Sequence, residues 1–497
     1  MSLINGIGAW YFKNRTKNIF DAVQNPLPLQ ENTLHKLINT AKETYFGKLF
    51  QFNQIKNYES FSKLVPISSY EEFYPMIDKL LKGEENVVWP GEIQWFAKSS
   101  GTTNNVSKFI PVSFETMEQC HFEGGKDALA IHCYQQPNTK IFDGKGLLIG
   151  GSHKANPENK KSNYGDLSAL LMNEMPFWAS LIKTPNLSIA LIEDWEEKIE
   201  KMAINTMNEN VTSISGVPTW TMAVLKKVLT LSNKSNIKSV WPNLELFVHG
   251  GINFTPYKDA FYDLIGTDKI NFIETYNASE GFFGLQLVQG ENMNLMPQYG
   301  IYYEFRNTKT GEICNLSKIE TQVQYEVIIS TASGLWRYCI GDTLIFTQKI
   351  PFKFIITGRT KSCINAFGEE LMVHNADTAL EKTCKKHQVN LQEYTAAPIF
   401  SHNETSLGTH EWIIAFDKLP VNEEQFKIDF DNALKALNSD YAAKRAHNLA
   451  MDTPVIHLTS KKVFYNWLAK KEKLGGQNKI PRLSENRVFI KDILQYL

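Results

Sequence analysis

The sequence predicts an α/β protein: a large N-terminal α/β domain with a β-rich subdomain, and a smaller, mobile C-terminal α+β domain. Three observations support this. Short apolar strands at 147–149 and 244–248 alternate with helix-like segments. From about 283 to 357, strand-like segments follow one another with little helix between them. The 497 residues exceed one ordinary core, and we place the boundary between residues 1–357 and 358–497.

The N-terminal segments read as helices. Apolar residues recur at three- and four-residue steps over the first fifty or so positions, with a break at Asn25 and Pro26. A helix after Ser68 or Ser69 should end before Gly83, because serine is a good N-cap. Ser113 opens a helix of about 114–132, and the polar stretch 152–166 reads as an exposed loop.

The remaining elements follow the same rules. Helices are expected near 195–209 and after Pro218, and strands at 211–214 and 270–276. Strands of the β-rich part are expected at 285–287, 300–305, 322–330 and 343–345, and the pair 358–359 is a candidate linker. Beyond the linker we expect helices at 374–387, 422–437 and 462–472, and strands at 412–416 and 455–458.

Composition excludes several functional classes. Lys plus Arg (52) nearly balances Asp plus Glu (53), which gives no electrostatic footprint for nucleic acid or an acidic membrane. No apolar run is long enough for a membrane span, and the N-terminus lacks the charge and apolar core of a signal peptide. Six scattered cysteines without a Cys-x-x-Cys pair suit reduced thiols in the cytoplasm, not a disulfide frame or zinc site.

A hydroxyl-rich segment joins two expected strands. Ser99, Ser100, Thr102 and Thr103 flank Gly101, with lysines at positions 98 and 108. Glycine allows close backbone approach, and hydroxyls with backbone N–H groups can surround phosphate oxygens. A Walker A loop is excluded because its lysine leads into a helix, whereas Lys108 leads into a strand. An ordinary solvated hairpin loop remains the alternative.

Three further clusters each have a structural alternative. Tyr276 to Gly281 follows a strand, where tyrosine can stack on a base and Glu280 can hold Mg²⁺, but Ser279 could instead cap a helix. Asp342 follows Gly341 beside aromatic residues and can accept from ribose hydroxyls, but a Gly-Asp β-turn is common. Arg337 in the same cluster suits phosphate or carboxylate.

The last cluster is a glycine-flexed loop at 475–483. Lys479 in this loop could be delivered to a site and withdrawn from it, and an exposed basic turn is the alternative.

Together, in this order, the clusters resemble the GH3 acyl-acid amido synthetase family, a branch of the adenylate-forming superfamily. The segment 99–103 resembles its phosphate loop, and Tyr276 to Glu280 its Tyr-x-x-Ser-Glu motif. Residues 336–342 resemble its Tyr-Arg-Tyr-x-x-Gly-Asp motif, and 475–482 its C-terminal lysine loop. Two departures stand out: Asn105 replaces a glycine of the phosphate loop, and Trp336 replaces the leading tyrosine of the third motif.

The resemblance implies an acyl-adenylate synthetase-like fold and a ligase that uses ATP and Mg²⁺ to adenylate a carboxylic acid, then transfers the acyl group to an amine such as an amino acid. Lys479 and Glu280 would be catalytic, with Glu280 the magnesium ligand. Val217, Trp220 and Phe282 would line the acyl pocket. The nucleotide-binding residues would be Ser99, Ser100, Gly101, Thr102, Thr103, Lys108, Gly250, Gly251, Tyr276, Ser279, Asp342 and Arg359.

Other functions share parts of this pattern. An acyl-CoA synthetase would use a thiol in place of the amine, and a regulatory nucleotide-binding protein would lack turnover. A P-loop kinase is disfavoured by the strand that follows Lys108.

Overall fold

A computed structural model describes residues 3–99, 108–251, 254, 258–359, 363–400, 407–416, 418–446, 450–460, 462–470 and 482–497. The chain forms two compact units: the larger contains most of the described residues up to 359, and the smaller those from 363 onward. Each unit has its own buried apolar core. The mixed helix and strand content confirms the predicted α/β class.

Within the described residues, a twelve-stranded sheet runs through the larger unit. Its strand order is β13-β12-β14-β15-β16-β11-β10-β9-β8-β7-β3-β6. Strands β9, β8, β7, β3 and β6 are parallel, and β10 to β16 pair antiparallel. The bounds are β3 (Lys145–Leu148), β6 (Lys183–Thr184), β7 (Val211–Gly216), β8 (Leu246–Gly250), β9 (Asn271–Ala278), β10 (Gly281–Leu285), β11 (Met293–Leu295), β12 (Ile301–Asn307), β13 (Ile313–Asn315), β14 (Gln324–Thr331), β15 (Tyr338–Gln348) and β16 (Lys353–Arg359).

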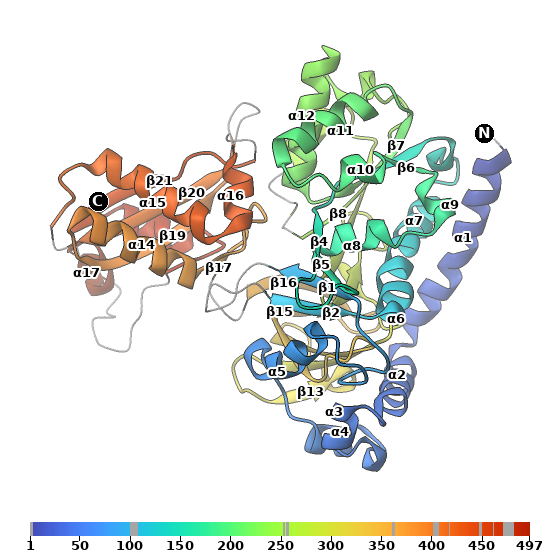
Figure 1. Cartoon of the computed structure of the whole chain (residues 1–497). Helices are drawn as coiled ribbons and strands as arrows, with labels where there is room; N and C mark the ends of the chain where they lie inside the picture. The colour runs from blue at the N-terminus through green and yellow to red at the C-terminus, as the bar shows by residue number, and fades with distance from the viewer. Residues whose placement is uncertain are drawn as a thin grey trace. The chain divides into compact units, whose positions relative to one another are not determined.

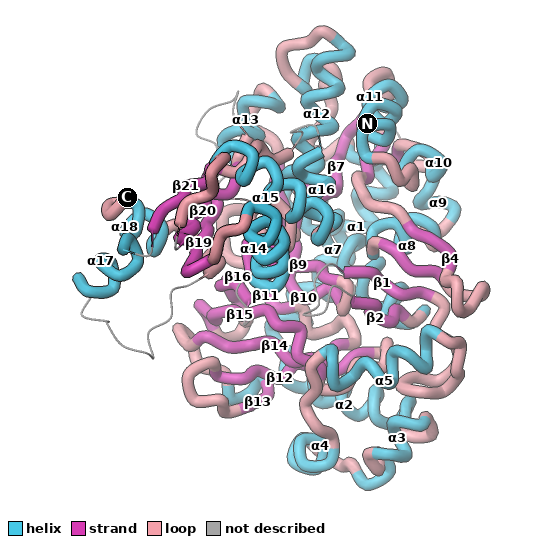
Figure 2. The backbone as a smooth tube through the Cα atoms, turned by 60° about the vertical axis from the view of Figure 1, so that its left-hand side comes forward, coloured by secondary structure: helices cyan, strands magenta, loops and turns pink. Residues whose placement is uncertain are grey.

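Helices lie around this sheet (Figure 1). Helices α2 to α5 gather beside the antiparallel strands, and α11 and α12 lie towards the opposite end of the unit, as Figures 1 and 2 both show. The N-terminal helix α1 packs along α7. The bounds are α1 (Leu3–Gln24), α2 (Pro26–Ala41), α3 (Tyr45–Leu49), α4 (Tyr58–Leu64), α5 (Tyr70–Leu81), α6 (Phe114–Thr116), α7 (Glu123–Gln135), α8 (Leu167–Asn173), α9 (Phe177–Ser180), α10 (Leu187–Ala190), α11 (Trp195–Thr206), α12 (Pro218–Ser232) and α13 (Lys258–Ile265).

Two local predictions are confirmed in detail. Helix α2 begins with Pro26 at its first turn, where a missing N–H costs nothing. Helix α5 begins after Ser69, which forms a capping box with Glu72. One helix departs from its prediction: between α6 and α7 the chain makes a π-helical turn at Met117–Phe122.

The part of the chain that the structure describes also forms a second, four-stranded sheet with the order β2-β1-β5-β4. Strands β1 (Trp95–Ser99) and β2 (Lys108–Val112) are antiparallel, as the sequence predicts. The prediction of an exposed loop over 152–166 is wrong, because β4 (His153–Ala155) and β5 (Asn163–Gly165) lie there. Their polar sequences show no strand pattern, and they are ordered by pairing with β1 and with each other.

The candidate linker at 358–359 is also misplaced. Gly358 and Arg359 are the last residues of β16, where they pair with Thr343 and Asp342 of β15. A glycine-arginine pair resembles a linker in isolation, and only the partner strand identifies it as sheet.

The smaller unit is an α+β fold. Its sheet has the order β19-β20-β21, and Trp412 of β20 packs against Phe430 of α15 at the core. The bounds are β17 (Cys363–Ile364), β18 (Leu371–Met372), α14 (Val373–His387), β19 (Leu391–Ile399), β20 (Thr409–Phe416), α15 (Glu423–Leu437), α16 (Ser439–Arg445), β21 (Val455–Ser460), α17 (Lys462–Lys470) and α18 (Val488–Leu494).

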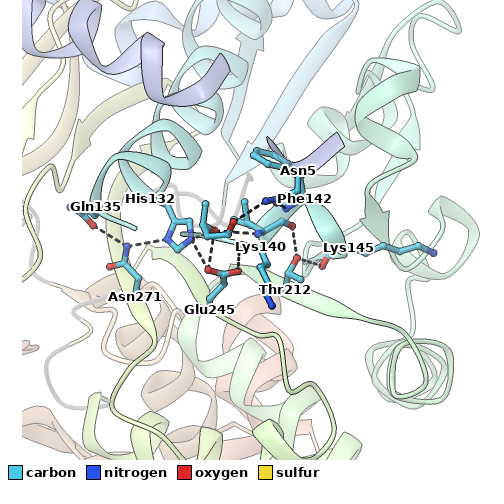
Figure 3. A network of polar contacts seen from close by, with 11 residues as sticks. Asn5, His132, Gln135, Lys140, Phe142, Lys145, Thr212, Glu245 and Asn271 are labelled. Atoms are coloured by element: carbon cyan, nitrogen blue, oxygen red, sulfur yellow. Dashed lines mark hydrogen bonds and ion pairs between the residues drawn. The ribbon is translucent and has the colours of Figure 1, made fainter. Parts of the chain in front are cut away.

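A polar network lies at the amino ends of the parallel strands (Figure 3). Glu245, just before β8, accepts from the Thr139 hydroxyl at 2.9 Å and from the Lys140 backbone N–H at 2.7 Å. His132 lies 3.0 Å from the Thr139 hydroxyl through Nε2 and 3.1 Å from Asn271 of β9 through Nδ1. The network therefore ties α7 and the segment after it to the starts of β8 and β9.

Candidate active site

Tyr276 and Asp342 meet near the carboxyl end of β9. The Tyr276 hydroxyl donates to the Asp342 carboxylate, although the two residues come from different strands. The Tyr276 ring is 7% exposed and packs against Phe283, with ring centroids 4.9 Å apart. Two residues predicted to bind a nucleotide are thus brought together at the edge of a sheet that commonly carries ligand sites in α/β folds.

The backbone around Asp342 explains its orientation. Gly341 has φ +87°, a conformation that residues with a Cβ rarely adopt. Both residues lie within β15, so the β-turn alternative is wrong. Asp342 pairs across the ladder with Arg359, which brings two predicted nucleotide residues into register.

Glu280 lies in a two-residue turn. Ser279 and Glu280 connect β9 to β10, since Ala278 pairs directly with Gly281. No helix begins here, so the N-cap alternative is wrong. Burial raises the pKa of Tyr338 well above its ordinary value, and the charge of Glu280 adds to the shift, which places Glu280 within electrostatic reach of this tyrosine.

Lys108 lies at the base of the predicted phosphate loop. It pairs with Ser99 across the β1–β2 ladder, and its ammonium lies 5.4 Å from the ring centroid of Tyr70. The Tyr70 hydroxyl accepts from the Phe109 backbone N–H at 2.9 Å. Tyr70 also contributes to the raised pKa of Tyr338. Lys108 is therefore a neighbour of Tyr70, and Tyr70 and Glu280 both lie within electrostatic range of Tyr338.

Several predicted residues cannot be placed. Ser99 ends β1, and its side chain, like that of Arg359, lies outside the description. The rest of the phosphate loop and the catalytic lysine lie outside the described residues: Ser100, Gly101, Thr102, Thr103 and Lys479.

Gly250 is the last residue of β8, and Gly251 follows it at the same edge. A Cβ on Gly250 would lie 2.3 Å from the Thr275 carbonyl oxygen, so this glycine allows β8 and β9 to approach each other. Gly251 has φ +84°, and its Cβ would lie 3.5 Å from Val217. A predicted nucleotide residue and a predicted acyl residue are therefore neighbours.

The other two acyl candidates differ in their surroundings. Trp220, in α12, packs against Trp195 with ring centroids 4.0 Å apart. Phe282 is 4% exposed and fills the space above Gly124, where a Cβ would lie 2.4 Å from its ring. Phe282 is thus a core residue, and its position gives no support to an acyl-binding role.

Arg337 does not serve the site as its motif suggests. Its guanidinium donates to both carboxylate oxygens of Glu304 at 2.8–3.2 Å and to the carbonyls of Ser62 and Val65, each at 2.8 Å. Both charged side chains are almost fully buried. Arg337 is therefore a structural residue, and the neighbouring Trp336 is likewise in the core, donating to the Val88 carbonyl at 3.1 Å.

Two buried groups near the site were not predicted. The Tyr338 hydroxyl is fully buried and has no hydrogen-bond partner among the described residues. His121, in the π-helical turn, lies 3.0 Å from Asn277, the residue after Tyr276, and burial lowers its pKa to about 4. Tyr338 belongs to a motif, so its spacing could have indicated it. No sequence signal indicates a π-helical turn.

The candidate residues in the described part of the chain have the chemistry that a nucleotide bound with Mg²⁺ requires. Within the described ranges, no group of three or more His, Cys, Asp or Glu residues could hold a metal by itself. Mg²⁺ bound with a nucleotide needs only one or two carboxylates, because phosphate oxygens and water complete its shell. Glu280 can supply one carboxylate, Asp342 can accept from a ribose, and the unpaired Tyr338 hydroxyl can donate. The described residues therefore fit such a ligand.

Family models match most of the chain. The GH3 family N-terminal domain matches residues 15–270, the central domain 294–359 and the C-terminal domain 374–488. The chain belongs to the GH3 family. All the motifs quoted above from residue 99 to residue 342 fall in or beside the first two matches.

Curated relatives of this GH3 protein have low sequence identity to it, but the matched regions cover most of both chains. A 4-substituted benzoates-glutamate ligase of Arabidopsis thaliana is 22% identical over 68% of the chain and 70% of its own length. A probable indole-3-acetic acid-amido synthetase of Oryza sativa subsp. japonica is 22% identical over 93% and 92%.

Solved structures show the same fold. AtGH3.15 acyl acid amido synthetase in complex with 2,4-DB superposes with a TM-score of 0.62 at 16% identity, covering 97% of this chain and 95% of that one. A 2-hydroxyisobutyryl-CoA ligase with 2-HIB-AMP and CoA has a TM-score of 0.56 at 12% identity, covering 95% and 92%. The GH3 chain thus has the fold of adenylate-forming ligases.

Among the described helices, none combines the length and the hydropathy that a membrane span requires.

Proposed function

We propose that this GH3 protein is an acyl-acid amido synthetase that uses ATP and Mg²⁺. A carboxylate oxygen of the acid attacks the α-phosphorus of ATP, and pyrophosphate leaves with its bonding electron pair. The amine nitrogen of an acceptor then attacks the acyl carbon, AMP leaves, and the nitrogen loses a proton as the amide forms. Adenylation is needed because a carboxylate is a poor electrophile.

One observation carries this proposal: the contact between Tyr276 and Asp342 beside the Glu280 turn, in a chain of the GH3 family. In this arrangement Asp342 accepts from the ribose hydroxyls while Tyr276 orients its carboxylate. The Tyr276 ring and the glycines after β8 contact the base, and Ser279 and Arg359 lie beside the nucleotide.

The phosphates of ATP would be held by residues 99–103 and Lys108, together with Glu280 and Lys479. Hydroxyls and N–H groups of residues 99–103 bind the phosphate oxygens, and Lys108 adds positive charge at the base of the loop. Glu280 would hold Mg²⁺, which offsets negative charge as pyrophosphate departs. Lys479 donates to the α-phosphate during adenylation. The C-terminal domain, which follows β16, would rotate between the two half-reactions.

The substrates follow from chemistry and relatives. Relatives act on benzoates with glutamate, on indole-3-acetic acid and on jasmonate with amino acids, according to their names. We assign this chain a small carboxylic acid and an amino-acid amine, with Val217 and Trp220 beside the acid. A cytoplasmic location suits an ATP-dependent ligase whose cysteines are not oxidised to disulfides, and Cys120, Cys133, Cys314, Cys339 and Cys384 form none.

The proposal is tested by ATP–pyrophosphate exchange over a panel of small carboxylic acids, followed by mass spectrometry of products with amino acids and coenzyme A offered together. We expect acid-dependent exchange and an acyl-amino acid product. A thioester product would identify an acyl-CoA synthetase, and silence across the panel would favour a regulatory protein without turnover.

A further inference from the structure

Two lysines of the larger unit are buried enough to lower their pKa, and one of them lacks a partner among the described residues. Burial lowers the pKa of both Lys183 and Lys198 to about 8. Lys198 donates to the Gly150 and Gly151 carbonyls at 3.0 and 2.9 Å. Lys183 makes no hydrogen bond or ion pair with any described residue, and no carboxylate offsets the effect of burial on its pKa. An unpaired cation in such a place costs free energy, so its retention needs a cause.

The ammonium of Lys183 lies directly against the sheet. Lys183 in β6 pairs with Gly146 of β3, which in turn pairs with Ser213 of β7. A Cβ on Gly146 would lie 2.9 Å from the Lys183 Nζ and 2.9 Å from the Ser213 hydroxyl oxygen. The lysine therefore extends inward over a position without a side chain, whereas lysines commonly direct their charge outward to solvent. We call Lys183, Gly146 and Ser213 the β3 anion site.

One face of β7 is accessible along the line that leads away from this site. Side chains alternate along a strand, so Ser213, Ser215 and Val217 share one face and Ile214 lies on the other. Lys183, Ser215 and Val217 are partly accessible, whereas Ile214 is fully buried. The accessible face of β7 therefore joins the β3 anion site to Val217.

The far end of this line is the predicted acyl site. Val217 lies beside Gly251, where the proposed function places the acid next to the nucleotide. Val217 follows Ser213 by four positions, which is about 13 Å of extended strand. An acid bound at Val217 therefore reaches Lys183 only if it is elongated and carries a second anionic group at its far end.

We propose that the β3 anion site binds the distal carboxylate of the acid substrate, so that this substrate is an elongated dicarboxylic acid. The Lys183 ammonium would supply the charge and its N–H donors, and the Ser213 hydroxyl a further donor. Gly146 would leave the space that a side chain fills elsewhere. The bound carboxylate would complete the lysine, which explains why an unpaired cation is retained. This inference rests on the proposed function, because it names the class of acid that adenylation takes.

Pyrophosphate exchange with matched acids tests the assignment. α,ω-Dicarboxylic acids of increasing chain length are compared with their monomethyl esters, which keep the length and lose one charge. We expect the parent protein to prefer a free dicarboxylic acid of sufficient length. Lys183→Met should raise the KM for that acid about 10- to 100-fold, because one charge-assisted hydrogen bond is lost. It should change kcat, and the KM for the ester, by little.

Two further variants accompany this measurement. Ser213→Ala keeps the charge and loses the hydroxyl, so it should shift the same KM in the same direction by less, and it replaces Lys183→Met if that variant does not fold. Lys145→Met is the matched control, because Lys145 adjoins Gly146 in β3 but is paired with Glu209 at 2.7 Å. It should leave the preference for the dicarboxylic acid unchanged.

Thermal midpoints separate ligand binding from a structural role. Lys183→Met should raise the midpoint, because it removes an unpaired charge, whereas Lys198→Met should lower it, because two carbonyls lose their donor. The preferred dicarboxylic acid, added without ATP, should raise the midpoint of the parent and not that of Lys183→Met. This readout does not depend on turnover.

The outcomes distinguish the inference from the function on which it rests. If the parent adenylates acids without preferring dicarboxylic ones, or if Lys183→Met leaves their KM unchanged, the inference alone fails. A change confined to the KM of the amino-acid acceptor would assign Lys183 to the acceptor and overturn it as well. If no acid supports exchange, but a dicarboxylic acid stabilises the parent and not Lys183→Met, the proposed function fails and carboxylate binding at Lys183 is supported.

Discussion

The parallel strands β8 and β9 end in contrasting environments. At their amino ends, Glu245 uses both carboxylate oxygens in short hydrogen bonds within the network of Figure 3. At their carboxyl ends lie glycines and the Tyr276–Asp342 contact. Nearby, the His249 Nδ1 and the Tyr338 hydroxyl are buried without a partner among the described residues.

This difference shows how one sheet separates stability from ligand binding. A buried polar group without a hydrogen bond costs free energy, so it is retained where a ligand can complete it. Most polar groups of the amino-end network are satisfied internally, although the Asn271 Oδ1 is buried without a hydrogen-bond partner among the described residues. The network holds α7 in place. The carboxyl ends leave donors and acceptors available. Substitutions at the two ends should therefore change different measurements.

The largest effect is expected from a residue that looks catalytic but is structural. Arg337→Ala should lower the free energy of unfolding of the larger unit by about 3–5 kcal/mol, because it leaves Glu304 buried without its partner. Chemical denaturation followed by tryptophan fluorescence measures it. Lys82→Ala, which removes an exposed ion pair with Asp78, should cost much less. Equal losses would show that burial is not the cause.

A large loss of activity is expected from a substitution at the carboxyl ends of the parallel strands. Glu280→Gln should lower pyrophosphate exchange by about two to three orders of magnitude, as loss of one electrostatic group at a reacting centre does. Its thermal midpoint should stay near that of the parent, since the residue lies in a turn. Magnesium titrations with Glu291→Gln, an exposed carboxylate paired with Lys353, serve as the control. Full exchange with an unaltered magnesium requirement would remove Glu280 from the site.

A smaller effect is expected for the hydroxyl that orients Asp342. Tyr276→Phe keeps the ring and loses the hydrogen bond, which should weaken ATP binding by about tenfold, or 1.4 kcal/mol. Tyr299→Phe is a matched control, because its hydroxyl donates at 2.7 Å to Asp127, which is not one of the predicted nucleotide residues. Isothermal titration with ATP distinguishes them, and equal affinities for the two variants would count against the contact.

Local features of the fold could be predicted from the sequence, whereas contacts between residues far apart in the chain could not. Capping of α5 by Ser69 and the β1–β2 hairpin depend on neighbouring residues, so local pattern suffices for them. The role of Arg337 depends on Glu304, 33 positions away, and that of His121 on Asn277, 156 positions away. Such partners are set by sheet order. The resemblance to the GH3 motifs nevertheless implied that Tyr276 and Asp342 serve one nucleotide, and the two side chains are in contact.

An effect of similar size, which depends on pH, is expected at the amino ends. Burial alone would raise the pKa of Glu245, but hydrogen bonds from His132, Thr139 and the Lys140 N–H outweigh it and lower the pKa. A lowered pKa contributes stability above the ordinary carboxyl value, and that contribution is lost as the pH falls below it. Glu245→Gln should cost about 1–2 kcal/mol at pH 7, with the difference from the parent shrinking below about pH 4.3. A difference that grows in acid would contradict this sign.

One paired measurement tests the central claim most directly: pyrophosphate exchange and thermal midpoint, recorded side by side for Asp342→Asn and Glu245→Gln. We predict that Asp342→Asn loses exchange and keeps its midpoint, while Glu245→Gln lowers the midpoint and keeps exchange below its transition. Full exchange in Asp342→Asn, together with a loss in folded Glu245→Gln, would contradict the assignment of the site to the carboxyl ends.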